Sequence, residues 1–105
     1  MGMIEITDDE RRRNPRFRAQ WPVELGAASG LTENLSLNGV FFQTNVRVSA
    51  GEELSFVVIV AEEGQLPVRL HCTGRVVRAE QRGSLAGVAA TIDTFWFETI
   101  GERSH

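Results

Sequence analysis

Residues 31–44 read LTENLSLNGVFFQT, and this stretch decides the fold class. Polar and apolar side chains roughly alternate up to Leu37, and apolar and aromatic residues resume at Val40, which is the pattern of two half-buried strands. Between the two strands lies Asn38-Gly39, a pair that tolerates positive φ and commonly closes tight hairpins. The stretch therefore predicts a β-hairpin that turns at this pair.

Further strand-like segments, separated by turn residues, lie on both sides of the hairpin. Together with it they cover residues 21–25, 31–37, 40–44, 54–60, 68–79 and 85–92, and Gly74 is expected to bend or bulge the longest segment. Short strands at near-regular spacing are typical of antiparallel barrels. The sequence predicts an all-β fold, a six-stranded antiparallel (split) β-barrel.

The hydrophobic period changes after the last of these strands. Apolar and bulky residues now follow the spacing of one helical face, at Ile92, Phe95, Trp96, Thr99 and Ile100. Asp93 can cap the start of a helix and Gly101 can end it. We therefore expect a short C-terminal α-helix of about two turns that docks its aromatic stripe on the barrel core.

The length of 105 residues suits one domain with a single core. Residues 1–10 carry four acids and little apolar content, so we expect a mobile N-terminal tail followed by one domain over residues 11–105. No apolar run approaches the roughly 20 residues of a membrane span, and no secretory signal is recognisable. The expected location is cytoplasmic, without membrane insertion. Cys72, a lone cysteine, leaves any metal site short of thiolates, so no metal is expected.

Charge is distributed unevenly along the chain. The formal net charge is −3, all eleven basic residues are arginine, and five of them fall within residues 11–18. From residue 19 onwards, six arginines face ten acidic residues. A nucleic-acid binder usually has a broad basic surface, so one concentrated basic segment on an acidic domain favours a small anionic ligand over a nucleic-acid polymer.

The basic segment reads RRRNPRFR over residues 11–18. Pro15 prevents a continuous helix and favours an extended conformation at Asn14, so several guanidinium groups can converge on one centre. Guanidinium binds phosphate or a guanine edge through paired N–H donors and stacks on bases. The alternative is a solvated basic stretch paired with the acidic residues just before it.

A second polar cluster lies at the hairpin. Asn34, Ser36 and Asn38 alternate with leucines and present amide, hydroxyl and amide groups on one side, and Gly39 allows close approach to the backbone. Such groups can read a purine edge, although an outward polar face leading into a turn would look the same. If residues 21–25 and 31–37 pair around a turn at 26–30, Arg18 lies opposite Leu37 or Asn38, so the two clusters meet.

Together the clusters resemble the two-part signature of the PilZ domain, the bacterial receptor module for cyclic di-GMP. The resembling residues are Arg12-xxx-Arg16, followed by Asn34-x-Ser36-xx-Gly39. The resemblance extends over nearly the whole chain. It implies that the two arginines clamp phosphates and guanines and that the second motif wraps around one guanine.

The resemblance also implies finer expectations. Arg11 resembles the extra arginine of members that bind a stacked pair of nucleotides. Residues 87–90 read GVAA, where the family often has a charged and an aromatic residue after Gly-Val, so a ligand contact from that strand is in doubt. The expected protein is a receptor or adaptor that needs no cofactor, binds cyclic di-GMP and signals to an unidentified downstream protein, as a monomer or a weak homodimer.

Other classes of function fit the sequence less well. His71 and Cys72 are neighbours on a predicted strand and point to opposite faces, and no phosphate loop, zinc spacing or nucleophile elbow is present, so no enzyme is expected. An OB-like barrel for single-stranded nucleic acid would need exposed aromatics along a basic groove. A PilZ-like module that docks on a protein without nucleotide remains the closer alternative, although such members typically lack the arginine motif.

Overall fold

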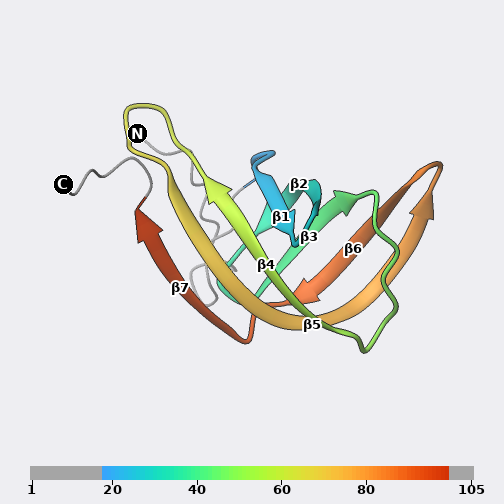
Figure 1. Ribbon diagram of the computed structural model, residues 1–105. Coiled ribbons are helices and arrows are strands. Elements are labelled where there is room, and N and C mark those ends of the chain that lie inside the picture. Colours follow the sequence, from blue (N-terminus) through green and yellow to red (C-terminus); the bar gives the residue numbers. More distant parts are fainter. Residues whose placement is uncertain (1–17, 100–105) are drawn as a thin grey trace, which may run out of the picture.

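The computed structural model describes residues 18–99, which form seven β-strands (Figure 1). The strands are β1 (Pro22–Leu25), β2 (Ala28–Leu35), β3 (Gly39–Thr44), β4 (Glu53–Val60), β5 (Val68–Arg82), β6 (Leu85–Thr91) and β7 (Thr94–Thr99). The expected tail at residues 1–10 and the arginines at positions 11, 12 and 16 lie outside the described residues. Within residues 18–99 no helix is present that could cross a membrane.

Six of the strands close into a barrel. The order is β4-β1-β2-β3-β6-β5, every neighbouring pair is antiparallel, and β4 pairs with β5 to complete the circuit. Closure removes the free edges that an open sheet of this size would expose. The all-β, six-stranded antiparallel barrel predicted from the sequence is therefore confirmed.

The interior is filled by alternate residues of each strand, as the pleat requires. Val23, Phe42, Val58 and Val88 have no exposed surface, and the tilted rings of Phe42 and Phe56 lie 5.8 Å apart at their centroids. At roughly 25 cal/mol per Å² of buried apolar surface, this core is the main stabilising contribution to the fold.

The first hairpin is tighter than predicted. Leu25 pairs with Ala28, so the turn contains only two residues, and its first residue, Gly26, has a φ of 61° that favours glycine. Pro22 consequently pairs with Leu31, whereas the expected register would place it opposite Glu33 or Asn34. The predicted register, which set Arg18 opposite Leu37 or Asn38, was wrong for the same reason, because residues 28–30 belong to β2 rather than to the turn.

The predicted C-terminal helix is wrong over the described residues, which form β7 instead. β5 is 15 residues long, and β6 pairs only with its second half, from Val76 onwards. This leaves one edge of Val68–Thr73 open, and β7 fills it with antiparallel pairing (Figure 1). Aromatic and β-branched residues suit such a strand, whereas a two-turn helix nucleates poorly. The aromatic side chains of β7 are exposed and do not fill the core.

Candidate functional site

A cavity of about 420 Å³ lies where β2 passes into β3. Its walls come from the end of β2, the following turn, the start of β3, one position of β5 and two positions of β6. They comprise Asn34, Leu35, Ser36, Asn38, Gly39, Val40, Phe41, Val77, Ala90 and Thr91. The structure thus brings together all three predicted residues of the second motif, namely Asn34, Ser36 and Gly39.

Two β-bulges adjoin the cavity. In β2, Thr32 pairs with Phe42 but Asn34 already pairs with Phe41, so Glu33 is the extra residue. In β5, Val77 is the extra residue, and its side chain lines the cavity. Bulges change which face the following residues occupy and are common beside functional sites. The bulge at Glu33 therefore places Asn34 on the same outward face as Phe41, while Leu35 returns to the core.

The side-chain carbonyl of Asn34 has no hydrogen-bond partner. Within residues 18–99, Oδ1 of Asn34 is the buried side-chain nitrogen or oxygen atom that lacks one. An unsatisfied buried acceptor costs on the order of 1–3 kcal/mol, so native proteins retain few of them without a reason. Asn34 lines the cavity, so a small rotation of its side chain would let a bound ligand donate a hydrogen bond to Oδ1.

Ser36 organises the turn. Its Oγ accepts hydrogen bonds from the backbone N–H groups of Asn38 at 3.2 Å and Gly39 at 3.3 Å, and the backbone N–H of Ser36 donates to the Gly39 carbonyl at 2.9 Å. The turn is therefore centred on Leu37 and Asn38. Neither Asn38 nor Gly39 has a positive φ, so the predicted Asn-Gly turn with left-handed residues was wrong. Hydrogen bonds to the Ser36 hydroxyl stabilise this turn in place of left-handed backbone conformations.

At Gly39 a side chain is limited by space rather than by backbone conformation. A Cβ at this position would lie 3.1 Å from the carbonyl oxygen of Ala90 on the neighbouring strand β6. The backbone N–H of Ile92 also donates to the Asn38 carbonyl at 2.9 Å. The turn is consequently held against the end of β6, and its position follows the position of that strand.

Two arginines beside the cavity were missed by sequence reasoning. The guanidinium carbons of Arg82 and Arg78 lie 5.0 and 6.0 Å from the ring centroid of Phe41, which lines the cavity. Arg82 also forms a salt bridge with Glu33, with 3.1 Å between Nη1 and Oε2. Their alternation with Glu80 in residues 78–82 was the available signal, but the strand was predicted to end at Ala79. Two cationic groups of the barrel itself thus lie next to Phe41, a residue of the cavity wall, although neither arginine lines the cavity.

The first motif cannot be placed in the same way, since Arg11, Arg12 and Arg16 lie outside the described residues. The described chain begins beside the middle of β2, however. The backbone N–H of Trp21 donates to Thr32 Oγ1 at 2.9 Å, and the Thr32 hydroxyl donates to the Ala19 carbonyl. Because this segment runs antiparallel to β2, the path from Trp21 to Ala19 points towards the Asn34 end of β2.

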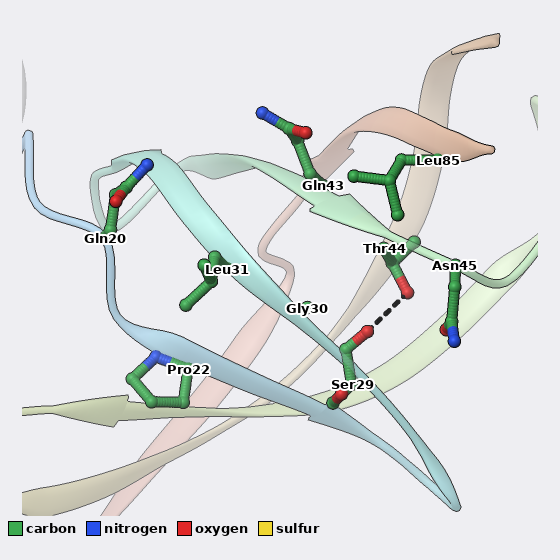
Figure 2. Close-up of a pocket in the computed structure, with 9 residues that line it drawn as sticks. All are labelled: Gln20, Pro22, Ser29, Gly30, Leu31, Gln43, Thr44, Asn45 and Leu85. Carbon is green, nitrogen blue, oxygen red and sulfur yellow. Dashed lines mark hydrogen bonds between the residues drawn. The ribbon is translucent and has the colours of Figure 1, made fainter. Parts of the chain in front are cut away.

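A second cavity, of about 560 Å³, lies along β2 and β3 near their other ends (Figure 2). Its lining includes Pro22, Leu31 and Leu85, and Thr44 closes one side by donating to the Ser29 carbonyl at 2.8 Å. Of the predicted site residues, the three that the structure describes, Asn34, Ser36 and Gly39, do not line it. In the described part of the chain, no three His, Cys, Asp or Glu side chains are placed to hold a metal ion.

Comparison with known proteins agrees with this geometry. The family model of the PilZ domain matches residues 10–94. None of the curated proteins compared matches the chain. Among solved structures, the inhibitor of motility MotI/DgrA of Bacillus subtilis is 17% identical with a TM-score of 0.67, over 82% of this chain and 44% of that one. The chain therefore spans less than half of that neighbour, and the likeness shows a shared fold. Because the family match extends over most of the chain and both motifs, the chain belongs to the PilZ domain family.

Proposed function

We propose that this PilZ domain is a receptor for cyclic di-GMP and that the nucleotide occupies the cavity at the end of β2. The observation that carries the proposal is that Asn34, which lines the cavity, has a buried Oδ1 without a hydrogen-bond partner. Guanine presents N–H donors on its Watson–Crick edge, and such a donor would satisfy this acceptor. Ser36 and Gly39 hold the turn that shapes the cavity around the base.

The phosphates are assigned to Arg12 and Arg16, with Arg11 as the candidate for a second stacked nucleotide. Covalent geometry supports this assignment. Three residues span at most about 11 Å, and Ala19, whose carbonyl accepts from Thr32, lies close to the cavity end of β2. The guanidinium of Arg16 is therefore within reach of a ligand in the cavity.

Arg78 offers a further cationic group next to Phe41. Its side chain is 61% exposed, and its contact with Glu80, at 3.5 Å from Nε to Oε2, is a weak surface pair. A phosphate could compete for this guanidinium at little cost. PilZ domains are receptor and adaptor domains rather than enzymes, so the output is a changed surface where residues 11–18 meet the barrel, read by a separate downstream protein.

Isothermal titration of the full chain with cyclic di-GMP, with GTP as the control ligand, tests the proposal. We expect saturable binding of the cyclic dinucleotide alone, and its stoichiometry decides between one nucleotide and a stacked pair. Arg16→Ala should abolish the binding while far-UV circular dichroism stays unchanged. Arg47→Ala, which changes an exposed arginine away from the cavity, should bind normally.

Two results would overturn the assignment. No heat from folded protein at high nucleotide concentration would favour a PilZ-type docking module that does not use nucleotide. Unchanged affinity in Arg16→Ala would remove the arginine motif from the site and leave the cavity and the two arginines next to Phe41 as the binding determinants.

A further inference from the structure

The outer edge of β7 is unoccupied in the described structure. β7 pairs with β5 through Val68–Thr73, and no other described strand pairs with it. The barrel closes without β7, so this strand runs along the outside of β5 (Figure 1). The family match also ends at residue 94, where β7 begins. β7 therefore lies outside the closed barrel and almost wholly beyond the family match.

The side chains of β7 are unusual for a free edge. Phe95, Trp96 and Phe97 are 40%, 58% and 57% exposed. Natural edge strands usually carry lysine, proline or a bulge that blocks pairing with another chain. β7 has neither lysine nor proline, and its pairing with β5 is regular. Its charged residue, Glu98, is already engaged, with 2.8 Å between its Oε1 and Nε2 of His71.

The aromatic side chains are also fixed in position. The Trp96 ring stacks on His71 with 3.9 Å between centroids and 3° between planes. On the opposite face, the rings of Phe95 and Phe97 meet edge to face at 5.9 Å. Rings that are ordered before association lose little conformational entropy on binding, which is typical of interface anchors.

We propose that β7 pairs antiparallel with β7 of a second copy of this chain, with the two Trp96 residues opposite each other. A two-fold interface needs a self-complementary surface, and Phe-Trp-Phe reads the same in both directions about Trp96. In this register Phe95 of each copy lies opposite Phe97 of the other on the same face. Glu98 lies opposite Thr94, so no like charges meet.

The size of this surface sets the strength expected of the dimer. Each aromatic residue can bury about 150–250 Å² in full, and roughly half of each is available here, or about 300 Å² per copy. Added to backbone pairing, this is near the small end of specific interfaces. The dimer is therefore weak and depends on concentration.

Sedimentation equilibrium of the full chain, from about 10 µM to about 1 mM, tests the interface in the range where small interfaces associate. We expect the mass to rise from one chain towards two. Trp96→Lys should keep the mass of one chain throughout. The matched control is Leu31→Lys, which changes a leucine of similar exposure, 46%, on β2 across the barrel, and should dimerise like the unchanged protein.

Two measurements identify the pairing itself. In a Cys72→Ala background, Trp96→Cys should form a disulfide-linked dimer under mild oxidation, whereas Thr99→Cys at the strand end should not. Hydrogen exchange of residues 94–99 should slow as protein concentration rises. A constant mass of one chain with fast exchange would overturn the proposal. So would slow exchange that is independent of concentration and is lost when residues 1–10 are removed, because the chain's own N-terminal segment would then cover the edge.

Discussion

Asn34 combines a structural cost with the role in nucleotide binding that we propose for it, and the two can be separated by substitution. Its Oδ1 is buried without a partner, so the free protein is destabilised by this atom. Asn34→Ala removes the acceptor, and we expect the free energy of unfolding to stay level or rise by up to about 1 kcal/mol. Nucleotide affinity should fall by about tenfold or more, the value of one hydrogen bond to the base.

Urea unfolding and isothermal titration of the same variant measure the two effects. Asn45→Ala, at an exposed asparagine just after β3, is the matched control and should change neither. A clear loss of stability in Asn34→Ala with unchanged affinity would make Asn34 a structural residue of the β2 bulge and would contradict its assigned role.

Cys72 makes the free energy of unfolding depend on pH in the alkaline range. Burial raises the pKa of its thiol from 9.0 to about 12, because the thiolate would lose its hydration in the core. Below pH 9 the thiol is protonated in both states and stability does not depend on it. Between pH 9 and 12 the unfolded thiol ionises and the folded thiol does not, so the free energy of unfolding falls as pH rises.

This pH dependence of the free energy of unfolding can be assigned to Cys72, because the chain has no lysine and no tyrosine that would titrate in the same range. Denaturation at a series of alkaline pH values should show that unfolding releases about one proton per molecule. Cys72→Val, which keeps a small apolar side chain in the core, should flatten the slope. A slope that persists in this variant would show that another group causes it.

The close crossing of β5 and β6 depends on Gly74. A Cβ at this position would lie 1.8 Å from the carbonyl oxygen of Thr91, and backbone cannot yield to that extent. We expect Gly74→Ala to destabilise the barrel by about 3 kcal/mol or more, at the upper end for overpacking. Gly83→Ala should cost only about 1–2 kcal/mol, because its Cβ meets open space and the cost comes from its φ of 63°. Urea denaturation followed by circular dichroism compares them, and equal losses would contradict the steric explanation.

The barrel strands were predictable because their hydrophobic period is a local property, whereas the structure of residues 94–99 was not. Ile92, Phe95 and Trp96 fit a helical face, and the same residues have high strand propensity. What decides between the two is the open edge of β5, which depends on where β6 stops pairing. That information is non-local and leaves no pattern within the segment itself.

The residues of the candidate site also differ in whether local sequence could predict their proximity. Asn34, Ser36 and Gly39 lie within six residues, so their proximity followed from the sequence. Phe41 and Arg82 come together only through the pairing of β3 with β6 and of β6 with β5. The unpartnered Oδ1 of Asn34 depends on the bulge at Glu33, and no sequence pattern marks that bulge.

At the scale of the whole molecule, the cavity and the β7 edge are joined by a short chain of backbone contacts. The Asn38 carbonyl in the cavity turn accepts from the N–H of Ile92, and the next N–H, of Asp93, donates to the Thr73 carbonyl at 2.7 Å. Thr73 in turn is hydrogen-bonded to Thr94, the first residue of β7. We propose that a ligand that orders the turn also orders the start of the edge strand through these hydrogen bonds.

If both proposals hold, nucleotide binding and dimerisation are coupled, and the coupling is reciprocal. We expect saturating cyclic di-GMP to raise the association constant of the dimer by about fivefold or more, the lower range of measured coupling between sites. The reason is that nucleotide binding already orders part of the surface that dimerisation would otherwise have to order.

Sedimentation with and without nucleotide gives this factor. Titrations above and below the dimer dissociation constant should give the same factor in nucleotide affinity. Arg16→Ala, which is expected to abolish nucleotide binding, should dimerise without responding to nucleotide. A dimer whose strength is the same at every nucleotide concentration would show that the edge and the cavity act independently.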